Sequence, residues 1–275
     1  MAHKLTIESQ SVQETMLIPL WGRAEYSHLY PELLDDPRAS EIMGKIDYDF
    51  SKVEKGFEDS GLSYLVRART FDDAIKEYAK QYPEATIVNL GSGLDTTFSR
   101  VDSGKIAWYD LDLPDATDFR KKLIPETARS RCIAKSAFDV SWFDDLDYEE
   151  EKGIYFIAGG LFYYFEESEI RRLVSSMAER FPDGGMIFDA VSKVGLWFAN
   201  RMVKKTGNTG AKGYFSLGDP VKRISGWSGN INVAEWYPYW RGVKRDPRWG
   251  KSTIFKMNFC DRLKMAKFVR LRFVK

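Results

Sequence analysis

The sequence is poor in cysteine and histidine, and its charges nearly cancel. It has two residues of each kind and a formal net charge of +1 over 275 residues. Cys132 and Cys260 are far apart and neither belongs to a C-x-x-C pair, which argues against a zinc site or a disulfide framework. The small net charge gives no general reason to expect a nucleic-acid partner. We therefore expect neither a metal nor a nucleic acid among the ligands.

The sequence also lacks a signal peptide and any apolar run long enough to span a bilayer. These absences predict a cytoplasmic protein with no membrane partner, and they leave the oligomeric state open. Hydrophobic residues make up 44% and aromatic residues 15%, which is enough for a sizeable core. The length suits one large α/β domain, or one domain with additions.

Charge is distributed unevenly along the chain. Residues 139–169 contain ten acids and one lysine, whereas residues 241–275 contain twelve Lys or Arg and two acids. Two interpretations are open: a solvated acidic loop with a basic final helix and strand, or a phosphate-binding face. Charge runs are most often solvated, so the first interpretation is favoured.

Apolar periodicity predicts strands that alternate with helices in the middle of the chain. The expected strands are 86–90, 105–110, 131–137, 153–158 and 185–191, and the expected helices are 64–82 and 167–181. This order predicts an α/β fold with a mostly parallel sheet and right-handed crossovers. A helix at 251–266 and a strand at 267–274 close the chain.

Two segments flank this pattern. Residues 1–62 show no strand alternation, and we expect short helices that form a cap or lid. Residues 63–275 would then be the main domain. Within it, residues 192–250 are rich in Gly and Trp, resist assignment to helix or strand, and are expected to be an insertion that forms a ligand pocket.

Residues 86–95, Thr-Ile-Val-Asn-Leu-Gly-Ser-Gly-Leu-Asp, are the most informative stretch. An apolar strand meets the glycine pair Gly91 and Gly93, and the next expected strand is followed by Asp112. A strand, a glycine turn and an acid about twenty residues later form the pattern with which α/β folds hold a nucleoside. The glycines let the backbone approach the ligand, and the acid accepts hydrogen bonds from ribose hydroxyls.

The residues after the glycine pair distinguish between two candidate nucleoside ligands. The dinucleotide fingerprint has a third glycine, where this chain has Thr96, and Asp95 comes just before it. A carboxylate beside a pyrophosphate is repulsive, but beside a sulfonium or an ammonium it is tolerable. The turn therefore favours S-adenosylmethionine over a nicotinamide dinucleotide.

Four motifs together resemble the leucine carboxyl methyltransferase family, which includes bacterial O-methyltransferases of tetracenomycin-type polyketide biosynthesis. The motifs are Asn89-Leu-Gly-Ser-Gly-Leu-Asp-Thr-Thr-Phe-Ser-Arg100, Asp110-Leu-Asp-Leu-Pro114, Ala158-Gly-Gly-Leu-Phe-Tyr-Tyr-Phe165, and Trp21-Gly-Arg-Ala-Glu25 with Leu34-Asp-Asp-Pro-Arg38. The resemblance runs from about Thr15 to Lys193. It implies a class I methyltransferase: a Rossmann-like, mostly parallel seven-stranded sheet with helices on both faces and S-adenosylmethionine as cofactor.

The resemblance also implies roles for individual residues. Arg67 matches the family arginine that binds the donor's methionine carboxylate, and Arg69 is the near alternative. Gly91 and Gly93 would lie under the methionine portion, and Asp112 would hold the ribose beside Leu113.

Two positions depart from the family pattern. Ser136 and Ala137 stand where an acid and a backbone N–H usually meet the adenine, and Asp139 lies nearby. Gly159 stands where the family usually has a glutamate that meets the donor's amino group. A backbone carbonyl or Asp95 would replace it, or else the protein binds the donor weakly or has lost activity.

The sequence indicates less about the methyl acceptor than about the donor, and we assign no catalytic residue. A carboxylate acceptor needs no general base, whereas a hydroxyl acceptor often needs one. His28, Tyr163 and Tyr164 are the candidates near the expected site, each with an alternative structural role. The tryptophans at 227, 236, 240 and 249 line a flat acceptor pocket or, as we favour, pack an insertion.

The bacterial character of the N-terminal motif favours a small organic, polyketide-like acceptor over a protein C-terminal carboxylate. A nucleic-acid methyltransferase is disfavoured, because no Asn-Pro-Pro-Tyr or Asp-Pro-Pro-Tyr motif occurs.

Overall fold

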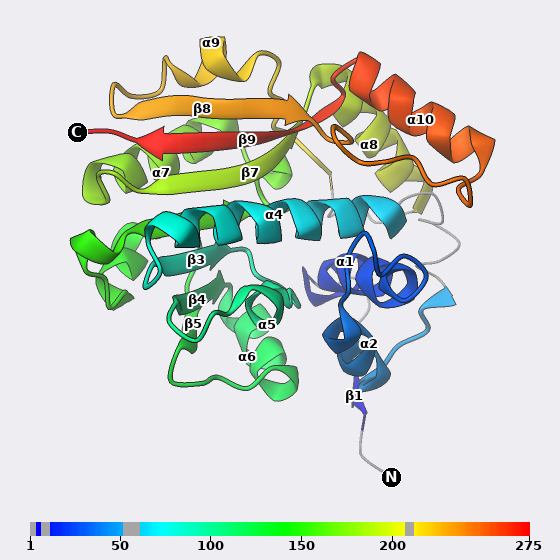
Figure 1. Cartoon of the computed structure of the whole chain (residues 1–275), viewed down its shortest axis with the longest axis horizontal. Coiled ribbons are helices and arrows are strands. Elements are labelled where there is room, and N and C mark those ends of the chain that lie inside the picture. The colour runs from blue at the N-terminus through cyan, green and yellow to red at the C-terminus, as the bar shows by residue number, and fades with distance from the viewer. Residues whose placement is uncertain (1–3, 7–11, 52–60, 207–211) are drawn as a thin grey trace. The chain divides into compact units, whose positions relative to one another are not determined.

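A computed structural model describes residues 4–6, 12–51, 61–206 and 212–275, and the chain divides into two compact units. The first is Met1–Asp147 and the second is Tyr148–Lys275 (Figure 1). Among the described residues, we find no helix with both the length and the apolar character needed to span a bilayer.

The first unit is built on three parallel strands in the order β5-β4-β3. They are β3 (Thr86–Leu90), β4 (Ala107–Asp112) and β5 (Ser130–Ala134). Every residue of β3 is buried, as expected for a parallel strand covered on both faces. β4 starts and ends two residues later than predicted, so Asp112 is its last residue and Asp110 lies inside it.

Helices complete the first unit. α4 (Gly61–Gln81) buries the apolar positions that predicted it, and it contacts α1 (Val12–Ser27) and α5 (Thr97–Val101). α6 (Pro114–Leu123) contacts β4 and β5. A 3-10 helix, η2 (Val140–Asp145), follows the third strand.

The N-terminal segment is more regular than predicted. α1 runs for 16 residues through Pro19, and α2 (Pro37–Gly44) follows it. The segment also contains a short strand pair that the sequence analysis did not predict, because β1 (Leu5–Thr6) pairs in parallel with β2 (Ile46–Asp47). One buried cluster joins α1 and α2 to Leu94 of the glycine turn and to α6. The hydrophobic effect therefore anchors this segment to the first unit.

The second unit contributes four strands in the order β6-β7-β9-β8. β6 (Ile154–Ala158) and β7 (Gly185–Val191) are parallel, whereas β9 (Ala266–Phe273) is antiparallel to β7 and β8 (Ile231–Pro238) is antiparallel to β9. The register of β8 shifts between Val233 and Glu235, which marks a bulge.

The helices of the second unit are α7 (Glu167–Arg180), α8 (Lys193–Thr206), α9 (Pro220–Ile224) and α10 (Lys251–Arg262), with the 3-10 turns η3 (Glu150–Lys152) and η4 (Phe162–Tyr164). The helix predicted at 251–266 is too long, because α10 ends at Arg262 and β9 begins at Ala266. Between them, the N–H of Met265 donates to the carbonyl of Cys260. The unassigned 192–250 stretch contains α8, α9 and β8. Three of its four candidate tryptophans, Trp227, Trp240 and Trp249, are buried.

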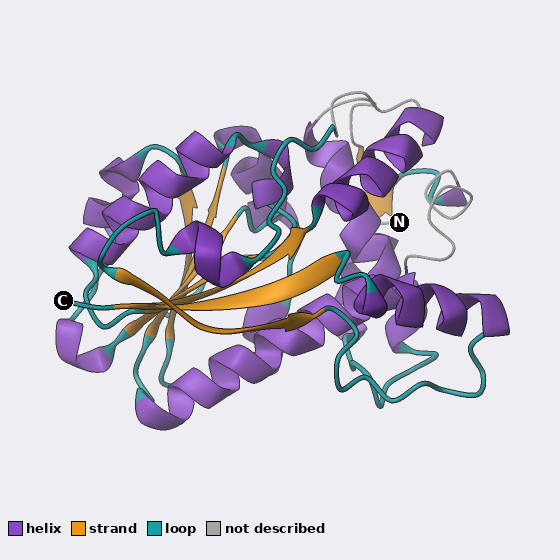
Figure 2. Ribbon diagram, turned by 90° about the horizontal axis from the view of Figure 1, so that it is seen from above, coloured by secondary structure: helices purple, strands orange, loops and turns teal. Residues whose placement is uncertain are grey.

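Together these strands give the predicted α/β fold with a mostly parallel seven-stranded sheet among the described residues, with β9 antiparallel to its two neighbours. Figure 2 distinguishes the orange strands of both units from the purple helices. The five strands predicted in the middle of the chain all exist, with boundaries shifted by no more than three residues.

Candidate functional site

The glycine turn after β3 has the backbone that its sequence requires. Gly91 and Gly93 have φ angles of 65° and 46°, a region that only glycine adopts without strain. The N–H of Gly91 donates to the carbonyl of Leu111 at 2.8 Å. A methyl group added at Gly93 would lie 3.1 Å from Met16 Cγ, a tight contact that the Met16 side chain would have to relieve. The positive φ angles and this close packing both favour glycine at the turn.

A buried arginine on α6 holds this turn in place. One terminal nitrogen of Arg120 donates to the carbonyls of Gly93 at 2.9 Å and Asp95 at 2.8 Å. The other donates to Asp110 Oδ2 at 2.7 Å, and both side chains are almost fully buried. Burial alone would lower the pKa of Arg120, but the carboxylates of Asp110 and Asp95 outweigh it and raise that pKa. Asp110 thus belongs to the support of the turn.

Asp112 stands at the end of β4 with its carboxylate fixed by two backbone donors. Gly93 N–H donates to Oδ2 at 2.7 Å, and Leu113 N–H donates to Oδ1 at 2.8 Å. Burial raises the pKa of Asp112, and these two hydrogen bonds counteract the rise only in part. Each oxygen keeps a further lone pair with which it can accept a hydroxyl.

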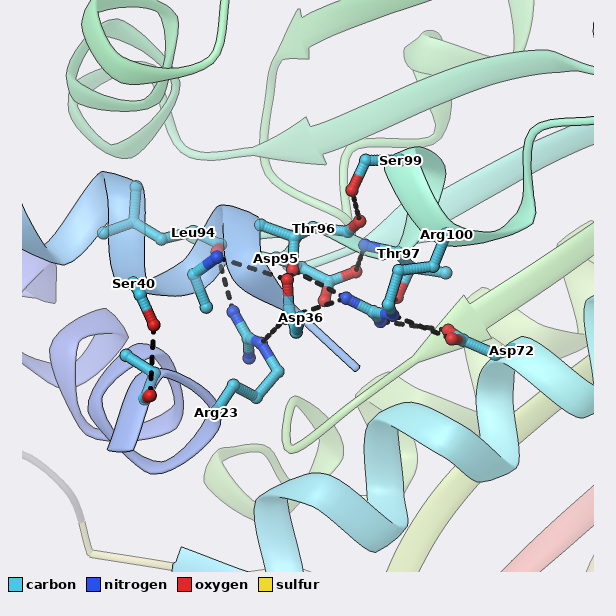
Figure 3. Close-up of polar contacts among 12 residues, drawn as sticks. Arg23, Asp36, Ser40, Asp72, Leu94, Asp95, Thr96, Thr97, Ser99 and Arg100 are labelled. Carbon is cyan, nitrogen blue, oxygen red and sulfur yellow. Dashed lines mark hydrogen bonds and ion pairs between the residues drawn. The ribbon is translucent and has the colours of Figure 1, made fainter. Parts of the chain in front are cut away.

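An ion network from the N-terminal segment surrounds the far end of the turn (Figure 3). Arg23 of α1 donates to Asp36 at 3.1 Å and to the carbonyl of Leu94 at 2.8 Å. Thr96, which stands in place of the third glycine, donates its hydroxyl to Asp36 at 2.6 Å. Asp36 also accepts from Ala39 N–H and so caps α2. The threonine is therefore explained by a partner 60 residues away in the chain.

Arg100 of α5 connects this network to α4. Its guanidinium forms a two-pronged pair with Asp72, at 2.7 and 2.9 Å, and donates to Asp36 at 2.9 Å. The carboxylates of Asp72 and Asp36 overcome the effect of burial and raise the pKa of Arg100. Figure 3 shows Arg100 between Asp72 on one side and Asp36 with Thr96 on the other. Such paired, buried charges fix the relative positions of three helices.

Asp95 remains ionised within this network. Burial by itself would raise its pKa, but the charges of Arg23 and Arg100 more than compensate and lower it. Its Oδ2 accepts from Asn89 Nδ2 at 3.1 Å and from Thr97 N–H at 3.4 Å. Asn89 also donates to Asp110, so one amide bridges the two carboxylates.

The two candidate arginines of α4 lie in different surroundings. Arg67 is half-buried, its guanidinium lies 5.3 Å from the centre of the Tyr64 ring, and its charge contributes to lowering the pKa of Arg23. Arg69 is exposed and forms a surface ion pair with Asp73 at 3.6 Å. Only Arg67 thus faces the side of α4 near Arg23, the arginine that contacts the glycine turn.

The residues predicted near the adenine follow the end of β5. Ser136 is half-buried, and its hydroxyl accepts from Phe138 N–H at 3.3 Å. Ala137 is buried, and its carbonyl accepts from Trp142 Nε1. Asp139 is exposed and accepts from Ser141 N–H at the start of η2, so its carboxylate caps a 3-10 turn.

In the second unit, Gly159 and Gly160 follow β6. Gly160 N–H donates to Asp189 of β7 at 2.7 Å, and the Tyr163 hydroxyl donates to the other oxygen of Asp189 at 2.8 Å. Tyr163 is therefore tied to a buried carboxylate, whereas Tyr164 is exposed.

Of the two histidines, His28 is exposed at the end of α1, with Nδ1 3.2 Å from the carbonyl of Ala24, and His3 lies outside the described residues. The position of His28 at a helix end gives it a structural explanation.

The residues of the first unit fit S-adenosylmethionine. The turn contains two left-handed glycines, and the fixed carboxylate of Asp112 lies beside it. Ser92 Oγ, between those glycines, is buried and has no hydrogen-bond partner among the described residues. A buried hydroxyl without a partner is costly, and a polar ligand or a water at the turn would satisfy it.

Sequence reasoning missed the residues that support the glycine turn of the first unit, namely Arg23, Asp36, Asp72, Arg100 and Arg120. It also missed Asp189, which binds Gly160 and Tyr163 in the second unit. Each is an ordinary charged residue in its local sequence. The one available signal was charge within apolar segments, as in Gly-Met-Ile-Phe-Asp-Ala-Val at 185–191.

Comparisons with known proteins agree with this geometry. A model of the leucine carboxyl methyltransferase family matches residues 17–178. The chain is 28% identical over 268 residues to the tetracenomycin polyketide synthesis O-methyltransferase TcmP of Streptomyces glaucescens, covering 94% of this chain and 97% of TcmP. It is 26% identical to the S-adenosyl-L-methionine-dependent methyltransferase dpfgK of Gibberella zeae, over 70% of each chain.

Solved structures share the fold at low sequence identity. A protein from Thermobifida fusca YX superposes with a TM-score of 0.63 at 12% identity, covering 86% of this chain and 93% of that one. The plantazolicin methyltransferase BamL, solved in complex with SAH, gives a TM-score of 0.51 at 11% identity, covering 96% and 97%. The family match spans more than half of the chain and includes the glycine turn and β4, the strand that carries Asp110 and Asp112. The chain therefore belongs to the leucine carboxyl methyltransferase family and is an S-adenosylmethionine-dependent methyltransferase.

Proposed function

We propose that the protein transfers a methyl group to an oxygen, carboxylate or hydroxyl, of a small organic, polyketide-like acceptor. The observation that carries this proposal is the similarity to TcmP, a polyketide O-methyltransferase, over 94% of this chain. The four quoted motifs of the first and second units support it, because the sequence resembles the bacterial branch in its N-terminal segment as well as in the glycine turn.

Each candidate residue has a proposed role in holding the donor. Arg67 pairs with the methionine carboxylate, and the backbone of Gly91 and Gly93 approaches the methionine portion. Asp95 stays ionised near the donor's cationic groups. Asp112 and Leu113 hold the ribose, Ser136 and Ala137 meet the adenine, and Gly159 offers a backbone carbonyl to the ammonium group. Residues 1–62 are proposed as the cap of the domain formed by 63–275, and residues 192–250 as the acceptor-pocket segment.

The residues of this chain would act mainly by positioning. When bound, the donor supplies an electrophilic methyl group on its sulfonium. Transfer is an in-line displacement, so an acceptor oxygen held at the right distance and angle, in a site without water, accounts for much of the rate. The ionised Asp95 and the fixed turn are rigid before binding, which limits the entropy lost when the donor is ordered.

Replacing Arg67 with alanine is expected to weaken donor binding by tenfold or more. A two-pronged arginine–carboxylate pair contributes roughly 1.5–3 kcal/mol, about a factor of 10–150 in affinity. The measurement is calorimetric titration of the wild type and the variant with S-adenosylmethionine, with S-adenosylhomocysteine and with NAD. Tight binding of NAD without any response to the methyl donor would sink the proposed function.

Arg69→Ala is the matched control for that titration. It removes the same side chain two residues away, from a surface pair with Asp73. We expect donor affinity to stay within about twofold of the wild type, since exposed pairs contribute little. Equal losses in both variants would contradict the assignment of the methionine carboxylate to Arg67.

Donor affinity is expected to fall on mild acidification because of Asp112. Burial raises the pKa of its carboxyl, and a protonated carboxyl accepts hydrogen bonds from ribose hydroxyls less well. Affinity should therefore decrease as pH falls through this raised pKa and level off above it. The same raised pKa makes protonation of Asp112 favour the folded state, so the titration of Asp112 itself does not weaken binding through unfolding. Titrations of wild type and Asp112→Asn across mildly acidic to neutral pH check this, and the variant should show a flatter profile with weaker binding.

A protein that binds the donor but has lost methyl transfer is the second candidate, because Gly159 replaces the family glutamate. Gly159→Glu distinguishes the two. If the backbone of Gly159 already serves the ammonium group, the added carboxylate will leave donor affinity unchanged or lower it. A large gain in affinity together with new methylation of hydroxyl or carboxyl test acceptors would favour a degenerate site in the natural chain.

A further inference from the structure

α10 presents an aromatic stripe to the solvent. Phe255, Phe259 and Leu263 recur every four residues and so lie along one face of the helix and its C-terminal end. They are 69%, 43% and 46% exposed. The two phenylalanine rings stack with centroids 6.1 Å apart and planes inclined by 17°. Single exposed apolar residues are ordinary, but three in a row along one helix face form a continuous apolar strip that needs an explanation.

The flanks of this stripe are basic. At the α-helical spacing of about 100° per residue, Lys251 and Arg262 lie on one side of the stripe and Lys256 lies on the other. All three side chains are exposed. The only acid within α10 is Asp261, which points elsewhere: it accepts from Trp240 N–H at 3.0 Å and pairs with Arg245 at 3.5 Å. The face formed by the stripe and its three cations therefore carries no carboxylate of α10.

The opposite side of α10 anchors it within the second unit. Met257 is buried, and Cys260 and Asp261 are partly buried. The contact of Asp261 with Trp240 fixes the helix to the segment that follows β8. In Figure 1, α10 is the orange-red helix that precedes β9. The aromatic and basic face is thus held outward by contacts on the other side of the helix.

We propose that this face of α10 binds the surface of a bilayer that contains anionic lipids. Interfacial helices combine an aromatic or aliphatic stripe, which enters the headgroup region, with Lys and Arg that meet the lipid phosphates. A second copy of the chain docking through the same helix would bring its Lys251, Lys256 and Arg262 against like charges, which disfavours that occupant. The absence of long apolar runs, from which the sequence predicts no membrane partner, does not bear on a helix that lies on the surface. The inference is independent of which acceptor is methylated.

The test is cosedimentation of the whole protein with vesicles of phosphatidylcholine alone or mixed with phosphatidylglycerol. We expect binding to the mixed vesicles, weak or no binding to the zwitterionic ones, and release by salt. Phe255→Ala/Phe259→Ala and Lys251→Glu/Lys256→Glu should each weaken partitioning by about tenfold or more, from lost apolar insertion and reversed charge respectively. Titration with S-adenosylhomocysteine should give wild-type affinity in both variants, which shows that the fold is intact.

The matched control is Val221→Ala/Lys222→Glu on α9, which removes an exposed apolar side chain and reverses an exposed lysine in the same unit. It should bind mixed vesicles about as well as the wild type. Failure of the wild type to bind anionic vesicles overturns the proposal, and so does an equal loss in the α9 control. Binding to soluble polyglutamate without binding to vesicles would also overturn it, since the face would then serve an acidic polypeptide.

Discussion

Replacing Arg120 with methionine should destabilise the folded protein by about 3–5 kcal/mol, because it leaves the buried carboxylate of Asp110 without its partner. The same change removes the donors to the carbonyls of Gly93 and Asp95, so the glycine turn should lose its fixed shape. We therefore expect a lower urea midpoint and loss of measurable donor binding. Chemical denaturation and calorimetric titration measure the two effects separately.

The double variant Arg120→Met/Asp110→Leu separates these roles. Replacing both members of a buried ion pair with apolar residues is often nearly neutral, so much of the stability should return. Donor binding should not return, because the turn carbonyls still lack their donor. Arg129→Met is the comparison for an exposed pair, since Arg129 meets Asp102 at the surface, and it should change unfolding little. Donor affinity at the wild-type level in the double variant would show that Arg120 does not order the turn.

Replacing Asp36 with alanine is expected to have an effect of similar size. It leaves two buried guanidinium groups, those of Arg23 and Arg100, without a shared carboxylate, at a cost of about 3–5 kcal/mol. It also removes the N-cap of α2, which adds about 1 kcal/mol. Because Thr96 loses its acceptor as well, we expect weaker donor binding alongside lower stability. Urea unfolding followed by fluorescence measures the first effect, and donor titration measures the second.

The variant Asp36→Asn separates the loss of stability caused by the missing charge from the loss caused by the missing N-cap of α2. The asparagine oxygen can still accept from Ala39 N–H, so the α2 cap should survive while the charge is lost. We expect this variant to unfold between the wild type and the alanine variant. Glu41→Ala, which breaks only the exposed pairs of Glu41 with Arg38 and Lys45, should leave unfolding almost unchanged. If Asp36→Ala were as stable as Glu41→Ala, the network would not hold the N-terminal segment in place.

Local sequence was sufficient to predict the elements with a strong period or a distinctive turn. β3 is an unbroken buried run that ends at two glycines, and the structure gives it the predicted boundaries. α7 was predicted within one residue, because apolar residues recur at helical spacing. In the structure, Glu166 and Glu169 also form a capping box at its start. The two-residue shift of β4 could not be predicted from the strand propensity of its residues, because its pairing with β3 determines where the strand begins.

The support of the site was not predictable in this way. In the sequence, Thr96 is only a departure from the three-glycine dinucleotide pattern. The structure shows that its hydroxyl donates to Asp36, and nothing in either local sequence links the two residues. Arg120 reads as one of three basic residues in the last turn of α6, yet it alone is buried against Asp110. Tertiary packing determines which residues far apart in the chain become partners, and a single sequence contains no direct sign of that packing.

The arrangement of the glycine turn and the acid was predictable, because it depends on backbone shape and strand order. Gly91, Gly93 and Asp112 lie together in the first unit, with Asp112 at the end of β4, as the sequence predicts. The segment proposed to form the acceptor pocket has weak local signals. Within residues 192–250, α9 is a single short turn and β8 contains a bulge, so neither shows a clean period.

The bulge in β8 has a consequence for how the protein behaves at high concentration. β8 is the outermost strand of the sheet, and an outer strand with regular spacing offers free N–H and C=O groups to another molecule. The register shift between Val233 and Glu235 interrupts that spacing, and Pro238 at the end of the strand has no N–H to offer. An incoming strand would meet a bent edge with the charge of Glu235 upon it. This edge therefore resists the strand-to-strand pairing that begins aggregation.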